Sequence, residues 1–203
     1  MMNKILILFI FFQTINNNES LVIIEKVNSK ILNYENISIN FTLNFKNQKI
    51  QEEQSGSIII SENKFRLEIN DQLIINDGKT QWIYLKSVNE LQIINNESYN
   101  GSFNLSDLLD FSNDKYKSKY IDEVYESNNK TKIIELYPKK EESFMKIELK
   151  LKSKNLDITN IKIFDKNGGS YSYKINSFNT NTKIPPFNFN TKEYPNIEII
   201  DLR

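Results

Sequence analysis

Apolar and polar residues alternate over long parts of this chain. The alternation is clearest at residues 37–45, 65–69, 145–151 and 171–175. Neighbouring residues of a strand point to opposite faces of a sheet, so each run predicts a strand with one apolar face. Shorter runs predict further strands at residues 57–60, 73–76, 80–85, 91–94, 133–137, 158–164 and 197–202. The pattern therefore predicts a mainly β chain.

Two dipeptides predict how some of these strands are joined. Asp77-Gly78 and Asn167-Gly168 each stand between two predicted strands. Asp-Gly and Asn-Gly readily adopt the left-handed backbone angles that tight hairpins need. Because hairpins join antiparallel neighbours, we expect a sheet dominated by antiparallel pairs.

Helical spacing occurs in two segments. From Ser20, a good N-cap residue, apolar side chains recur every three or four positions as far as Tyr34, which predicts an amphipathic helix. A second, shorter helix is predicted at residues 104–111. Its four apolar side chains form one stripe: Leu105, Leu108, Leu109 and Phe111.

These elements limit the architecture. Two short helices cannot cover the apolar faces of about ten strands laid out as a flat sheet. The sheet must therefore fold into a sandwich or curl around the helices. A curled sheet that does not close leaves an apolar concavity, which suits an apolar ligand. The pattern alone does not separate a filled core from such a cavity.

The first residues predict export. Lys4 precedes eight consecutive apolar residues, Ile5–Phe12. Crossing a bilayer as a helix takes about 20 apolar residues, whereas a charged start and a short apolar run are typical of a secretory signal. We expect a signal peptide at residues 1–19 and one domain at residues 20–203. A buried first strand and an uncleaved anchor are the alternatives.

Composition narrows the chemistry. The 203 residues include no His and no Cys, and 26 acidic residues balance 26 basic ones. Without those two residue types the chain has no imidazole base, thiol nucleophile, disulfide or thiolate metal site. The balanced charge also argues against a nucleic-acid partner. We expect no catalytic residue, no metal and no cofactor.

One hairpin carries a more specific signal. Residues 75–84 read Ile-Asn-Asp-Gly-Lys-Thr-Gln-Trp-Ile-Tyr, which resembles the (S/N)DGKTxWxY stretch of the LolA family, the periplasmic carriers of outer-membrane lipoproteins. Residues 88–93, 164–168, 187–189 and 194–203 resemble, in matching order, forms of this family from Bacteroidetes-type bacteria. The chain is thus similar to LolA proteins from its first helix to its last residue.

The resemblance implies a fold and a function. The implied fold is mainly β with a few α-helices: an unclosed antiparallel β-barrel, or half-barrel, with a helical lid over an apolar cavity. The implied function is that of a monomeric carrier, not an enzyme, which binds the acyl chains of lipoproteins and moves them across the periplasm. Its expected partners are acylated lipoproteins, an inner-membrane lipoprotein-releasing ABC transporter and an outer-membrane acceptor.

The resemblance also suggests roles for residues. The apolar stripe of residues 104–111 is expected to be a lid that plugs the empty cavity. Arg66 is a candidate latch for this lid, with a surface ion pair as the alternative. Ordinary core packing is the alternative for the expected lipid-binding cavity residues, which are Phe41, Leu43, Phe45, Phe65, Leu67, Ile69, Trp82, Tyr84, Met145, Ile147 and Leu149.

Other classes of protein remain as alternatives. A related half-barrel could bind another lipid or sense envelope stress, and an exported structural β-domain would have a filled core. A glycosidase would need paired carboxylates such as Glu52 and Glu53, or Glu141 and Glu142. Adjacent residues of a strand point to opposite faces, so these pairs are poorly placed to share a site.

Overall fold

The computed structural model describes residues 11–95, 109–126 and 128–203. These residues form one long helix, α1 (Phe11–Leu32), and a short 3-10 helix, η3 (Thr191–Glu193). Their strands are β1 (Ile37–Lys46), β2 (Gln51–Ser61), β3 (Lys64–Ile69), β4 (Gln72–Asn76), β5 (Thr80–Leu85), β6 (Glu90–Asn95), β7 (Tyr116–Glu126), β8 (Asn129–Pro138), β9 (Phe144–Lys152), β10 (Ile158–Asp165), β11 (Ser170–Thr180) and β12 (Glu198–Asp201).

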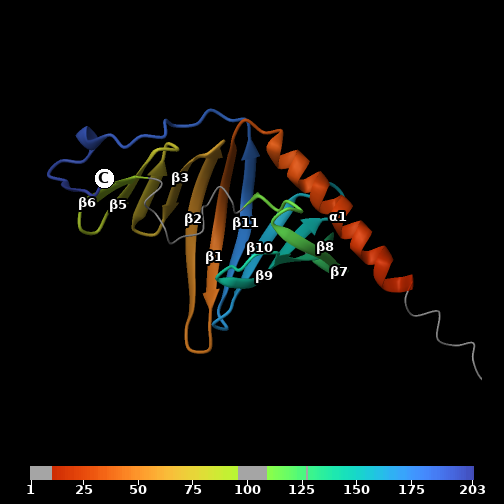
Figure 1. The fold of residues 1–203 in the computed structure, drawn as a ribbon. Helices are drawn as coiled ribbons and strands as arrows, with labels where there is room; N and C mark the ends of the chain where they lie inside the picture. Colours follow the sequence, from red (N-terminus) through yellow and green to blue (C-terminus); the bar gives the residue numbers. More distant parts are fainter. Residues whose placement is uncertain (1–10, 96–108, 127) are drawn as a thin grey trace, which may run out of the picture. The chain divides into compact units, whose positions relative to one another are not determined.

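The strands form one open sheet (Figure 1). Its order is β12-β6-β5-β4-β3-β2-β1-β11-β10-β9-β8-β7, so β12 and β7 are the two edges. The pairs from β2 to β6 and from β7 to β10 are antiparallel, whereas β12 runs parallel to β6. Gly78 and Gly168 have φ angles of 94° and 82°, as the predicted hairpins require. The predicted mainly β fold with an unclosed antiparallel sheet is confirmed.

The chain divides into two compact units, each built from segments that are far apart in the sequence. Unit 1 contains α1 up to Ile31, together with β7, β8, β9, β10 and the start of β11. Unit 2 contains β2 to β6, β12 and most of β1 and β11. Each unit has apolar faces of its own.

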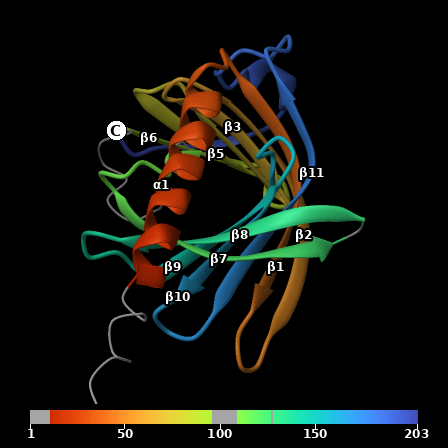
Figure 2. The ribbon, with the colours of Figure 1, turned by 90° about the vertical axis from the view of Figure 1, so that its right-hand side faces the viewer.

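In unit 1, α1 lies over one face of the strands (Figure 2). The stripe predicted from helical spacing makes this contact, since Ile24 and Val27 are buried. Ser20, on the same side of α1 as Ile24 and Val27, accepts a hydrogen bond from the Ser118 hydroxyl of β7, with 3.0 Å between the two oxygens. We call the covered surface the Leu149 face. It includes Ile134, Leu136, Ile147, Leu149, Leu151 and Ile161.

The predicted start of this helix is wrong. We expected Ser20 to be the N-cap, but α1 already begins at Phe11. The Ser20 side chain is buried against β7 and bonds to Ser118, so it does not cap a helix end. Within the described residues, no helix combines the length and the apolarity needed to cross a lipid bilayer.

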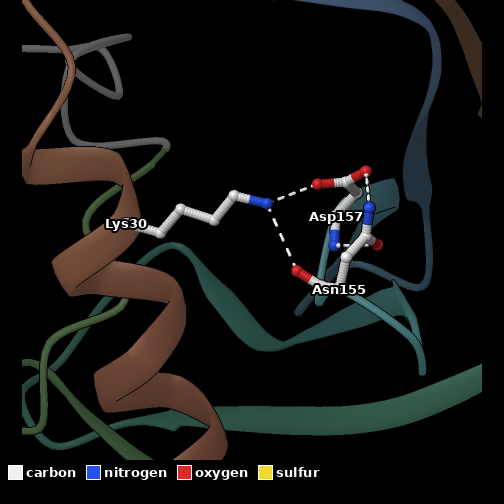
Figure 3. A network of polar contacts seen from close by, with 3 residues as sticks. All are labelled: Lys30, Asn155 and Asp157. Atoms are coloured by element: carbon white, nitrogen blue, oxygen red, sulfur yellow. Dashed lines mark hydrogen bonds and ion pairs between the residues drawn. The ribbon is translucent and has the colours of Figure 1, made fainter.

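The last turn of α1 is tied to the turn between β9 and β10 (Figure 3). The Lys30 ammonium donates to the main-chain oxygen of Asn155 at 3.2 Å and forms an ion pair with the Asp157 carboxylate. The Asn155 amide donates to the other oxygen of that carboxylate. Lys30 and Asp157 are both more than one-third exposed, so the pair contributes more to positioning the helix than to stability.

In unit 2, the register from β2 to β6 sorts side chains into two faces. One face carries the row Ile60, Phe65, Asn76, Gln81 and Ile94 and the row Ile58, Leu67, Ile74, Ile83 and Gln92. We call it the Phe65 face. The opposite face carries the row Ile59, Arg66, Ile75, Trp82 and Ile93 and the row Ser57, Glu68, Leu73, Tyr84 and Leu91. We call it the Trp82 face.

Candidate functional site

The Trp82 face is covered by residues 187–203, which we call the C-terminal segment. Leu73, Ile75, Tyr84 and Leu91 form its buried cluster. Partly buried side chains from β5, β6 and residues 187–197 pack against this cluster, namely Trp82, Ile93, Phe187, Phe189, Tyr194 and Ile197. The ring centroid of Tyr84 lies 5.4 Å from that of Phe189 and 4.6 Å from that of Tyr194. This face is therefore core.

The register places the predicted cavity residues of β3 and β5 on two different faces. Trp82 and Tyr84 lie on the face opposite to Phe65 and Leu67, because adjacent residues of β3 to β5 alternate and the strands pair without a bulge. The two sets of residues cannot line one surface. Trp82 and Tyr84 belong to the packed cluster of the Trp82 face, and their role as cavity residues stays a prediction.

The Phe65 face is apolar over β2 and β3. Its members Ile58, Ile60, Phe65 and Leu67 are between 2% and 8% exposed. These side chains are thus almost inaccessible to solvent in this structure. The Phe65 face is the candidate lipid-binding surface, because the Trp82 face is already occupied.

Phe41 of β1 also belongs to this surface, because its ring lies against Gly56 of β2. A Cβ atom at Gly56 would lie 2.6 Å from Cζ of the Phe41 ring, so the ring rests on the bare main chain. The same ring makes an edge contact with Tyr173 of β11, with 5.7 Å between centroids. Ile69, the register partner of Gly56, is half-buried on this face. The predicted residues Phe41, Phe65, Leu67 and Ile69 are therefore brought together; Leu43 is half-buried on β1.

The same face becomes polar towards β6. Asn76 and Gln81 are 2% and 4% exposed, and the Asn76 amide donates to Oε1 of Gln81 at 3.3 Å. Farther along, the Gln92 amide donates to Oε1 of Glu90 at 2.7 Å. The Phe65 face thus carries no amide side chain over Ile58, Ile60, Phe65 and Leu67, whereas from β4 to β6 the amides of Asn76, Gln81 and Gln92 lie among the apolar side chains of Ile74, Ile83 and Ile94.

Three predicted cavity residues belong to unit 1. Ile147 and Leu149 are buried on the Leu149 face beneath α1. Phe45 packs on Tyr171, with 4.9 Å between ring centroids. These positions form the packing of unit 1 in this structure.

Met145 departs from the predicted alternation. Phe164 of β10 pairs with Lys146 of β9, and the next residue, Asp165, pairs with Phe144. Met145 therefore has no partner and is the extra residue of a β-bulge. Phe144 is buried in its place and Met145 is 51% exposed. Met145 therefore does not continue the face of Ile147 and Leu149.

The predicted lid is only partly described. Leu105 and Leu108 lie outside the described residues. Leu109, in unit 2, is buried. Phe111, in unit 1, is also buried, and its main-chain N–H donates to the Asn28 side chain of α1 at 3.1 Å. The lid role of this stripe stays a prediction.

Arg66 lies on the Trp82 face. It pairs with Ile59 on one side and Ile75 on the other, so it points away from Phe65 and Leu67, as the alternation predicts. Arg66 makes no ion pair with another described residue. Its role as a latch stays a prediction.

A cluster of charges stands where α1 meets β7 and β8. The Lys132 ammonium lies 3.3 Å from a carboxylate oxygen of Glu19, 3.5 Å from one of Glu123, and 5.2 Å from the centre of the Tyr120 ring. Burial lowers the pKa of Lys132, but Tyr120, Glu19 and Glu123 outweigh this and raise it overall. Lys132 therefore stays protonated, and the cluster ties the helix to the sheet.

Comparison with known proteins agrees with this architecture. A family model described as outer membrane lipoprotein carrier protein LolA matches residues 32–192. No curated protein sequence matches the chain. An uncharacterized conserved protein from Thermus thermophilus has a similar structure, with a TM-score of 0.56 and 13% identity over 90% of this chain and 99% of the other.

A second solved structure is also similar. It is a putative outer membrane lipoprotein-sorting protein domain from Vibrio parahaemolyticus, with a TM-score of 0.51 and 12% identity over 88% of this chain and 99% of the other. At these identities the two structures show a shared fold.

Proposed function

Because the chain belongs to the LolA family of outer membrane lipoprotein carrier proteins, we propose that it binds the acyl chains of lipoproteins and carries them across the periplasm from the inner to the outer membrane. Carriage of this kind makes and breaks no covalent bond. The observation that carries the proposal is the Phe65 face, an apolar surface built by Phe41, Phe65 and Leu67 that is separate from the core filled by the C-terminal segment.

The energetics explain why such a surface would be closed when empty. Moving an acyl chain of roughly 14 methylenes out of water is worth on the order of 11 kcal/mol, at about 0.8 kcal/mol per methylene. A carrier must supply most of this free energy and still release its cargo. A cover that leaves as the cargo enters achieves both, because cover and cargo compete for the same apolar area. We propose that the stripe of residues 104–111 is this cover.

Partners and location follow from the same proposal. An inner-membrane lipoprotein-releasing ABC transporter would load the carrier and an outer-membrane acceptor would unload it. Residues 1–19 would direct export and then be removed. Cleavage after Glu19 would break its contact with Lys132, so the mass of the mature periplasmic chain would show whether this contact survives.

A capture assay with a matched pair of variants tests the proposal. Ile74 and Ile93 are both half-buried isoleucines, but Ile74 lies on the Phe65 face and Ile93 on the Trp82 face. A fluorescent triacylated lipopeptide in liposomes is mixed with the protein, and the soluble complex is measured by gel filtration. We expect the wild type and Ile93→Asn to extract the lipopeptide, and Ile74→Asn to lose most of this capture.

Two outcomes would contradict the proposal. Absence of any soluble complex with the wild type would remove the carrier function. Equal loss of capture in both variants, at equal folded fraction, would remove the assignment to the Phe65 face. Mass spectrometry of the molecules that co-purify with the protein from the periplasm identifies the cargo. Bound phospholipid without lipoprotein would favour a related lipid-binding half-barrel.

A further inference from the structure

The polarity of the Phe65 face changes along its rows. The row that starts at Ile60 and Phe65 continues through Asn76 and Gln81, and the next row runs from Ile58 and Leu67 to Gln92. The side chains of these rows on β2 and β3 are all apolar, whereas those on β4 to β6 mix the amides with Ile74, Ile83 and Ile94. A surface with this pattern would hold an amphiphilic ligand in one direction, with its chain on β2 and β3.

Gln81 has hydrogen-bonding capacity to spare at the boundary. Its Oε1 accepts from the Asn76 amide at 3.3 Å, which leaves Nε2 with two N–H donors. Nε2 makes no hydrogen bond with another described residue. Gln81 as a whole residue is only 4% exposed. Such a group gains free energy from any acceptor that enters the face.

The charges on the Phe65 face determine which kind of hydrogen-bond acceptor of a ligand Gln81 could bind. The three rows of this face from β2 to β6 contain no Lys or Arg, and their one charged member is the acid Glu90, in the row Gly56, Ile69, Gln72, Leu85 and Glu90. An anionic phosphate or free carboxylate would meet no cation there and would lose its hydration. A neutral carbonyl needs only a donor. An ester or amide carbonyl next to an acyl chain fits this environment.

We infer that Gln81 is a specificity-determining residue, whose Nε2 donates a hydrogen bond to the ester or amide carbonyl of an acyl-chain ligand while the chain lies on Phe65 and Leu67. The inference rests on the proposed function, because it assumes that the Phe65 face binds acyl chains. Apolar burial then supplies affinity, and Gln81 sets which acylated molecules are preferred.

A pair of ligands that differ only in the carbonyl tests this role. Dimyristoylglycerol and its diether analogue, di-O-tetradecylglycerol, displace a fluorescent reporter lipid from the full chain. We expect the wild type to bind the diester about fivefold more tightly than the diether, the size of effect that one net hydrogen bond gives. In Gln81→Leu and Gln81→Met the ratio should fall to about one, with diether affinity unchanged within about twofold.

Two variants and one control keep the result interpretable. Gln81→Met preserves side-chain length and offers a weak sulfur acceptor to Asn76, in case Gln81→Leu does not fold. Gln92→Met is the control, because the Gln92 amide on the same face already donates to Glu90. Thermal unfolding followed by circular dichroism confirms that each variant is folded.

The outcomes separate the two proposals. A diester-to-diether ratio near one in the wild type, or a ratio that persists in the Gln81 variants, overturns the role of Gln81 and leaves the carrier function standing. Loss of the ratio in Gln92→Met also overturns the assignment to Gln81. If the wild type binds neither ligand and captures no lipopeptide, the proposed function fails and the inference fails with it.

Discussion

Gly56 shows how one residue shapes the candidate site. A Cβ atom there would lie 2.6 Å and 2.9 Å from the Phe41 ring and 3.0 Å from the main-chain oxygen of Glu68. We therefore predict that Gly56→Ala lowers the free energy of unfolding by about 1–3 kcal/mol through overpacking, measured by urea titration. At Gly169 a Cβ would lie 3.5 Å from the nearest atom, so Gly169→Ala should be neutral or slightly stabilising. Equal effects at both glycines would contradict the close packing of Phe41.

A second effect at the residue scale concerns Glu135, on the side of β8 opposite to the Leu149 face. Lys146 and Tyr137 donate to its two carboxylate oxygens. Burial raises the pKa of Glu135, but the hydrogen bonds from Lys146 and Tyr137 outweigh this and hold the pKa below its ordinary value of 4.5. A lowered pKa contributes stability above the unfolded-state pKa, and this stability is lost as the pH falls through the folded-state pKa.

Glu135→Gln should therefore destabilise the protein at pH 7 by about 1–3 kcal/mol, the cost of weakening charged hydrogen bonds. The difference from the wild type should shrink as the pH falls from the ordinary pKa of the unfolded chain through the lower folded-state pKa, because the unfolded carboxylate is protonated first and the folded one last. Urea unfolding at a series of pH values measures both effects. Glu148→Gln, directly across the register from Glu135, is the control. A stability difference that does not change with pH would contradict the ionised network.

At the scale of elements, alternation predicts strands well where a strand has one apolar face and no bulge. It succeeded at β1, β3 and β5, and the glycines at 78 and 168 marked their hairpins. It did not predict β7. In that strand the register shifts between Tyr120 and Asp122, and the outward side carries Lys117 and Lys119, so no continuous apolar row is visible in the sequence.

The candidate site was less predictable than the strands. Alternation shows which residues of one strand share a face, but only the register shows which faces of different strands match. Alternation alone therefore allows Trp82 and Phe65 to share one cavity, although the two point to opposite sides. Alternation does not single out Gln81 for the same reason. A polar residue in a strand is normally taken as solvent-facing, and its place in the Phe65 row follows only from pairing with Asn76.

The C-terminal segment is an element whose attachment can be tested. Asn89, with a left-handed φ of 53°, accepts a hydrogen bond from the Tyr84 hydroxyl and donates to the main-chain oxygens of Pro195 and Asn196 at 3.1 Å and 3.0 Å. We predict that Asn89→Gly and Asn89→Ala both speed proteolysis within residues 187–203. Asn89→Ala should be less stable than Asn89→Gly by about 1 kcal/mol, because alanine tolerates the left-handed backbone poorly.

The control for this experiment is Asn70, which also has a left-handed φ, of 49°. Asn70 lies in the turn between β3 and β4, far in the sequence from residues 187–203. Asn70→Gly should leave proteolysis of residues 187–203 unchanged. If Asn70→Gly accelerates it as much as Asn89→Gly does, the side-chain bonds of Asn89 do not hold the segment.

At the scale of the whole molecule, the described apolar side chains gather on three surfaces with different uses. The Leu149 face is covered by α1, which Ser20 and Lys30 tie to the strands. The Trp82 face is covered by the C-terminal segment, which Asn89 ties to β6. Hydrogen bonds thus hold the covers of these two faces in place. Under the proposed function, the Phe65 face is the surface on which a temporary cover and a ligand exchange.

This division can be tested with tryptophan fluorescence, because Trp82 is the one tryptophan of the chain. Bromine atoms on an acyl chain quench an indole only near contact. A brominated lipopeptide bound on the Phe65 face should therefore leave the fluorescence of Trp82 largely unquenched. In the double variant Trp82→Phe, Phe65→Trp the reporter moves to the opposite face, and the same ligand should quench most of its emission. Strong quenching of Trp82 in the wild type would instead mean that the ligand displaces Phe189 and Tyr194, which would make the C-terminal segment the cover and the Trp82 face the binding surface.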